Sequence, residues 1–173
     1  MIKKILVPVD GSAHSLKAVE LAGDLATKYD AEVVLLHVLL RGHMSEGLRK
    51  ALEVELGTEP RRGGGHLVNM PQQIMARVRD KKNNQLSLET LEVIGKYVLS
   101  KVTALCQEKG VEKVTQAVEE GDPAKTILEL AASDGIDLIV IGSRGHSDLR
   151  DLVVGSVSQK VAQLSKCPCL IVR

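Results

Sequence analysis

Residues 136–158 read IDLIVIGSRGHSDLRDLVVGSVS, and this stretch decides the fold. It opens with an apolar, largely β-branched run at 136–141, as expected of a parallel strand that is covered on both faces. Gly142 and Gly145 then favour a sharp turn in which exposed N–H groups can come close to a ligand. Gly155 and the hydroxyl residues after it indicate a helix start, where unpaired N–H groups and the positive end of the helix dipole suit phosphate.

Strands and helices alternate on both sides of this stretch. The apolar patterns predict strands at 2–9, 31–40, 113–118, 136–141 and 169–172, and helices at 13–29, 86–110, 123–132 and 156–165. Strands joined by a helix predict parallel pairing with right-handed crossovers. The order predicts an α/β, doubly wound, Rossmann-like fold, with a five-stranded parallel sheet and helices on both faces.

A single domain is expected to span residues 1–173, with an insertion at about 41–84 where the pattern breaks down. Short helices are expected within the insertion at 45–56 and 71–80, on either side of a glycine-rich break. A connection of this length is usually functional or mobile, and we expect it to lie over or beside the ligand.

Composition excludes several classes of function. The net charge is +1, and Tyr29 and Tyr97 are the only aromatic residues, which disfavours nucleic acid and anionic membranes as partners. No run approaches the roughly 20 apolar residues that span a bilayer. Cys106, Cys167 and Cys169 lack disulfide spacing, which fits a cytoplasmic location, and we expect them to be buried and inert.

The glycine spacing G-x2-G-x9-G-S over residues 142–156 follows a buried strand and precedes a helix, and ILVPVDGS stands at 5–12. Together these motifs resemble the nucleotide-binding signature of the ATP-binding branch of the universal stress protein family. The resemblance covers the chain outside 41–84 and implies the strand order 3-2-1-4-5. In such a sheet the crevice lies beyond the carboxyl ends of the first and fourth strands, which carry Asp10 and Gly142.

The resemblance also implies a role for each matching residue. Asp10 would accept hydrogen bonds from the ribose, while Pro8, Val9 and Val38 would bound the adenine pocket. The remaining nucleotide-binding positions, most of them at the phosphates, would be Ile141, Gly142, Arg144, Gly145, Gly155, Ser156, Val157 and Ser158. Simpler alternatives stay open: Asp10, Ser156 and Ser158 as helix caps, Val38 as core, and His37 as a hydrogen-bonded core histidine.

The implied ligand is ATP with Mg²⁺, and the implied role is a nucleotide-responsive stress or regulatory switch. A P-loop enzyme is disfavoured because G-x-x-x-x-G-K-[ST] is absent, and a dehydrogenase because no G-x-G-x-x-G follows the first strand. No catalytic residue and no metal ligand set is predicted, so at most slow ATP hydrolysis is expected. The alternative is a dimeric interaction module of the same fold that binds no nucleotide.

Assembly is expected to involve the last strand, 169–172, which lies at the sheet edge in this strand order. It is short and apolar, so we expect it to pair with its copy in a homodimer. A further protein partner is expected for a regulatory switch, and the sequence does not identify it.

Overall fold

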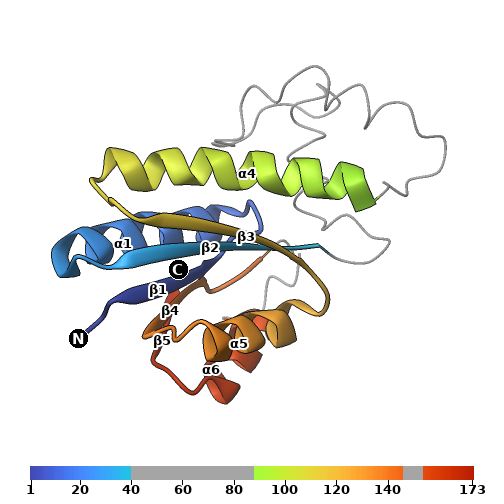
Figure 1. The fold of residues 1–173 in the computed structure, drawn as a ribbon. Coiled ribbons are helices and arrows are strands. Elements are labelled where there is room, and N and C mark those ends of the chain that lie inside the picture. The colour runs from blue at the N-terminus through green and yellow to red at the C-terminus, as the bar shows by residue number, and fades with distance from the viewer. Residues whose placement is uncertain (40–87, 146–153) are drawn as a thin grey trace.

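The computed structural model describes residues 1–39, 88–145 and 154–173 (Figure 1). The expected helices of the insertion, at 45–56 and 71–80, lie outside these residues. The elements are β1 (Lys4–Pro8), α1 (Ala13–Tyr29), β2 (Glu32–Leu39), α4 (Leu88–Glu108), β3 (Val114–Glu120), α5 (Pro123–Ser133), β4 (Leu138–Gly142), α6 (Ser156–Leu164) and β5 (Cys169–Val172).

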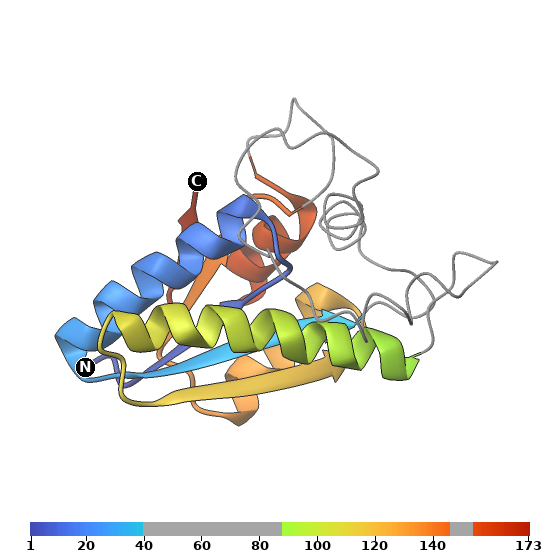
Figure 2. The same cartoon turned by 90° about the horizontal axis from the view of Figure 1, so that it is seen from above.

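The strands form a five-stranded sheet in the order β3-β2-β1-β4-β5, and every neighbouring pair is parallel. Helices α1 and α4 cover one face of the sheet, and α5 and α6 cover the other (Figures 1 and 2). The predicted fold class and the strand order implied by the resemblance are both confirmed.

The strands are apolar on both faces because each face has its own core. On β2, Val33 and Leu35 belong to the cluster beneath α1 and α4, whereas Val34 and Leu36 belong to the cluster beneath α5 and α6. All four are at most 1% exposed. Full burial of a side chain of this size contributes about 1.5–3 kcal/mol. Such continuous apolar runs are therefore what a sheet covered on both faces requires.

Two helix starts show how local chemistry places the turns at the carboxyl edge of the sheet. Ser12 caps α1, because its Oγ accepts the N–H of Ser15 at 3.1 Å. Asp10 is therefore not the cap of α1, and that alternative was wrong. Asp122 caps α5, because its side chain accepts the N–H of Lys125, and Pro123 stands in the first turn.

At the centre of the sheet, two strands that are far apart in the sequence lie side by side. Strand β1 pairs with β4 through Ile5 opposite Leu138 and Leu6 opposite Ile139. At the amino end of this pair, Asp137 Oδ2 accepts the backbone N–H groups of Lys3 and Lys4 at 2.7 and 3.1 Å. These hydrogen bonds lower the pKa of the Asp137 carboxyl.

The predicted edge position of β5 is confirmed, since among the described strands it pairs with β4 alone and ends the strand order. Leu170 on this strand is 38% exposed. The three cysteines are free thiols, but only Cys106 is buried; Cys167 and Cys169 are half-buried, which corrects the expectation for those two. Burial raises the pKa of Cys106 and Cys169 to about 11, so both thiols are protonated at neutral pH. None of the helices in the described ranges has the length and apolarity to cross a membrane.

Candidate functional site

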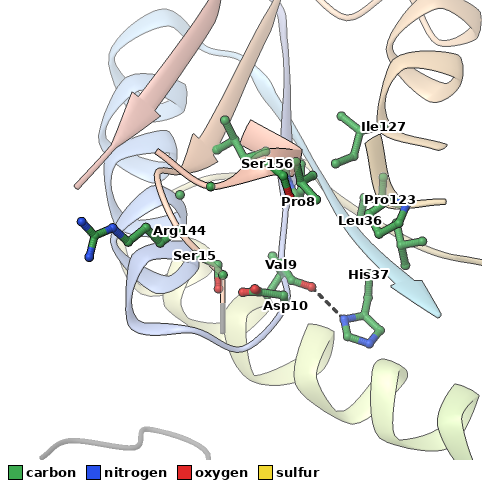
Figure 3. A pocket seen from close by; sticks show the side chains of 16 residues that line it. Pro8, Val9, Asp10, Ser15, Leu36, His37, Pro123, Ile127, Arg144 and Ser156 are labelled. Carbon is green, nitrogen blue, oxygen red and sulfur yellow. Dashed lines mark hydrogen bonds between the residues drawn. The ribbon is translucent and has the colours of Figure 1, made fainter. Parts of the chain in front are cut away.

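A cavity of about 250 Å³ opens beyond the carboxyl ends of β1, β2 and β4 (Figure 3). It lies where β1 and β4 leave the sheet toward opposite faces, which is the switch point of a doubly wound fold. The predicted residues that line it are Pro8, Val9, Asp10, Val38, Ile141, Gly142, Arg144, Gly145, Gly155, Ser156 and Val157. The structure therefore brings together in space all of the predicted residues except one.

Ser158 is the exception. Its side chain is 4% exposed, and its Oγ donates a hydrogen bond to the Gly142 carbonyl at 2.7 Å. It ties α6 to the end of β4 and does not line the cavity. Gly155, which has no side chain to accept a bond, is the N-cap of α6, so the alternative that Ser156 or Ser158 caps this helix was wrong. The first N–H groups of α6 therefore receive no side-chain cap.

Gly142 is required by the protein itself. A Cβ there would lie 2.7 Å from the carbonyl carbon of His14 and 2.8 Å from the nitrogen of Ser15. Strand β4 thus ends against the backbone of the first turn of α1, which no side chain would permit. The sequence suggested that a glycine at this position lets a ligand come close. Gly142 does line the cavity, but its lack of a side chain is needed for the contact with α1.

The other two glycines differ in what surrounds them. A Cβ at Gly145 would lie 2.7 Å from Asp10 Oδ2, so the loop passes directly over that carboxylate. A Cβ at Gly155 would lie 3.4 Å from the Ser143 oxygen, which is an ordinary contact. The Gly155 N–H also donates to this oxygen at 2.7 Å, joining the two ends of the loop. Of the three glycines, Gly155 is the one at which a Cβ would make no contact shorter than 3.4 Å with the described residues.

Asp10 lies at the cavity on the turn between β1 and α1 (Figure 3). Its Oδ1 accepts the N–H of Ser12 at 2.9 Å, which fixes one carboxylate oxygen. The Ser12 hydroxyl in turn donates to the Arg144 carbonyl at 3.4 Å, so this turn and the glycine loop are linked. The Arg144 side chain extends away from Asp10 (Figure 3).

Sequence reasoning did not place Ser15, Leu36, Pro123 or Ile127 at the site, although all four line the cavity. Three of them are apolar, and they form the wall opposite the glycine loop (Figure 3). One signal could have identified Pro123: it begins a crossover helix, and in this fold such helices begin at the carboxyl edge of the sheet.

The backbone of Val38 lies at the same cavity. Pairing of β1 with β2 ends at Pro8 opposite Leu36, followed by one bond from the Val9 N–H to the Leu36 oxygen at 2.7 Å. Backbone direction alternates along a strand, so the N–H and C=O of Val38 point to the same side as those of Leu36. Because β1 has already turned away, these two groups point into the space beyond it. Because the Val9 N–H donates to the Leu36 oxygen, it is not available as a donor to a ligand.

His37 lies at the same edge and is the hydrogen-bonded core histidine that the sequence suggested. Its Nδ1 is 2.7 Å from the Val9 oxygen, and the side chain is 3% exposed. Burial lowers the pKa of the imidazole. The hydrogen bond to Val9 and the nearby Asp10 raise it, but by less than burial lowers it. The ring is therefore neutral at pH 7. Across the described ranges, no group of three or more His, Cys, Asp or Glu side chains could hold a metal ion.

Known proteins are similar to this chain in sequence and in fold. The model of the universal stress protein family matches residues 1–173. Universal stress protein YxiE of Bacillus subtilis is 37% identical over 173 residues, covering 100% of both chains. A universal stress protein solved in complex with cAMP has a TM-score of 0.61 at 21% identity, over 99% of this chain and 97% of that chain.

A second solved structure, the Archaeoglobus fulgidus universal stress protein in complex with dAMP, has a TM-score of 0.58. It is 17% identical and covers 100% of this chain and 98% of that chain. The full-length family match, the identity to YxiE and the sheet order together show that this chain belongs to the universal stress protein family.

Proposed function

We propose that the cavity binds an adenine nucleotide, ATP with Mg²⁺, and that the protein acts as a nucleotide-responsive stress regulator. One observation carries the proposal: a carboxylate, a helix start without a side-chain cap, an apolar wall and the backbone of Val38 meet at one cavity. The cAMP and dAMP complexes of related proteins support adenine as the base.

The base and the ribose are assigned from the chemistry of the cavity. The N–H and C=O of Val38 suit the edge of a base, and the wall with Pro123 and Ile127 suits its apolar faces. The Asp10 carboxylate lies at the cavity, and carboxylate oxygens are acceptors that suit ribose hydroxyls.

The phosphates are assigned to the start of α6. Its first N–H groups and its dipole favour an anion between Gly145 and Gly155, both of which line the cavity. The cavity, at about 250 Å³, is below the range of roughly 300–1,000 Å³ typical of complete small-molecule sites. It fits a base and a sugar, with the phosphates along its mouth. Since the described residues offer no metal cluster, Mg²⁺ would be held by phosphate oxygens and water.

A regulatory role is favoured over turnover. Phosphoryl transfer needs a group that positions the attacking nucleophile. Among the residues that the structure describes, the ionisable ones that line the cavity are Asp10, His37 and Arg144. Asp10 is bonded to Ser12, the His37 ring is tied to the Val9 carbonyl, and Arg144 extends away from Asp10 (Figure 3). At most slow hydrolysis is expected.

The second candidate is a dimeric module that binds no nucleotide, and the apolar edge strand β5 favours dimerisation in either case. We propose a homodimer in which two copies of β5 pair, formed by one domain over residues 1–173. A cytoplasmic location is proposed from the three free thiols.

Calorimetry with ATP, AMP and GTP tests the first candidate, and mass measurement of the denatured protein identifies any nucleotide that co-purifies. Adenine nucleotides are expected to bind and GTP is not. Absence of any adenine nucleotide in both measurements, with a dimer in solution, would favour the interaction module.

A further inference from the structure

The ring of His37 lies beneath the turn that carries Asp10. It stands on the face of the sheet covered by α4, where a Cβ at Gly95 would lie 2.8 Å from the imidazole Cδ2. The absence of a side chain at Gly95 therefore makes room for the ring. Figure 3 shows the Nδ1 of this ring directed at the Val9 carbonyl, next to Asp10.

The proton on the ring can be assigned. A carbonyl oxygen only accepts, so Nδ1 carries the hydrogen and donates it to Val9 over 2.7 Å. Because burial lowers the pKa, Nε2 stays unprotonated at neutral pH. A leucine would fill this position without the cost of burying a polar ring, so the hydrogen bond is what the histidine contributes here.

Both polar backbone groups of Val9 are thereby held by β2. Its N–H donates to the Leu36 oxygen at 2.7 Å, and its C=O accepts from His37. Strand β1 ends at Pro8, so these two bonds are what hold the chain to β2 just before Asp10. The Val9 carbonyl and the Asp10 N–H belong to one planar peptide unit, so fixing the carbonyl fixes the backbone on which the Asp10 side chain is carried.

We propose that His37 is a positioning residue that holds the Val9–Asp10 peptide and thereby aims the Asp10 carboxylate at the ribose of the bound nucleotide. This role rests on the proposed nucleotide site. The residue acts through Val9 and Asp10, and its loss affects the ribose contact more than the contacts to base or phosphate.

Two variants separate the hydrogen bond from the bulk of the ring. In His37→Asn the amide nitrogen is bonded to Cγ, as Nδ1 is in histidine, so a donor remains in place. In His37→Leu the volume is similar and the donor is lost. The affinities for ATP and 2′-deoxy-ATP are measured by calorimetry, and their ratio reports on the contact to the ribose hydroxyl. Asp10→Ala defines the ratio without the carboxylate.

We expect the leucine variant to lose about tenfold or more in affinity for ATP and much less for 2′-deoxy-ATP. The ratio of its affinities for ATP and 2′-deoxy-ATP should approach the ratio found for Asp10→Ala. The asparagine variant should keep most of the ratio of the unaltered protein. If the leucine variant does not fold, His37→Gln takes its place. The glutamine amide lies one bond farther from the backbone than Nδ1 does, so it misses the Val9 carbonyl and the same loss of affinity for ATP is expected.

The outcomes distinguish this role from the function on which it rests. A leucine or glutamine variant that keeps the unaltered ratio, while Asp10→Ala loses it, overturns the positioning role alone. Equal loss of both nucleotides in the leucine variant also overturns it, because that pattern indicates general damage to the site. An unaltered protein that binds no ATP overturns the proposed function and this role together.

Discussion

Replacing Gly155 by alanine separates the needs of the fold from those of the ligand. The residue has φ −71° and ψ 157°, which any amino acid adopts. Its new Cβ would lie 3.4 Å from the Ser143 oxygen and 3.9 Å from the Gly145 nitrogen. Alanine is a poorer N-cap than glycine, but it also loses less conformational entropy on folding. We expect the free energy of unfolding to change by less than about 1 kcal/mol.

The effect on binding should be larger. A phosphate oxygen that accepts from the Gly145 N–H would lie about 2.9 Å from the nitrogen, and the new methyl group competes for this space. Losing one hydrogen bond to a charged group costs about 1.5–3 kcal/mol. The dissociation constant for ATP should therefore rise about 10- to 150-fold. Valine at Gly155 adds two more methyl groups and should abolish measurable binding.

Calorimetry with ATP measures the affinity, and circular dichroism during thermal unfolding measures stability. Gly135→Ala is the matched control, because this glycine has φ +65° and its Cβ would have no neighbour within 4 Å. That variant should lose about 1–2 kcal/mol of stability and keep its affinity for ATP. Unchanged affinity in both Gly155 variants, with both folded, would refute the assignment of phosphate to the start of α6.

Gly142, His37 and the edge strand β5 each allow a further test. Gly142→Ala should destabilise the fold by about 1–3 kcal/mol, measured by urea unfolding, because its Cβ would meet the backbone of His14. Burial lowers the pKa of His37 below its ordinary 6.5, so the unfolded chain binds more protons than the folded one below that pH. The free energy of unfolding should therefore be unaffected by His37 above pH 6.5 and should decrease as the pH falls from 6.5 toward the folded pKa. Thermal unfolding between pH 7.5 and 5 checks this, and His37→Asn should reduce the loss. Ile171→Pro should dissociate the proposed dimer, measured by analytical ultracentrifugation; an unaltered protein that is monomeric at micromolar concentration would contradict the dimer.

Much of the fold could be predicted because apolar runs and turn residues act locally. The cap at Asp122 and the edges of most elements follow from such signals, and β3 was expected at 113–118 where the structure has Val114–Glu120. The strand order could not be obtained this way, because the strand after a crossover can join either side of the sheet. It came from the family resemblance.

The candidate site was predicted less completely, since it depends on contacts between distant segments. The reason for glycine at position 142 could not be found from the sequence, because the obstacle is the backbone of His14 in another element. The hydroxyl of Ser158 looked suited to phosphate until its bond to the Gly142 carbonyl was seen. Ile127 was missed because only the packing of α5 brings it to the cavity.

The pairing of β1 with β4 also bears on how the protein folds. The first strand of the chain becomes the middle of the sheet, so β2 can join it early through a short crossover. The other side of β1, at Ile5 and Leu6, stays unpaired until β4 joins it, and β4 lies more than a hundred residues later in the sequence. Closing so long a loop costs more entropy and slows the step. Gly142 and Gly145 arrive with β4, so a refolding chain should regain the proposed nucleotide binding only in its last phase, after β2 is protected from hydrogen exchange.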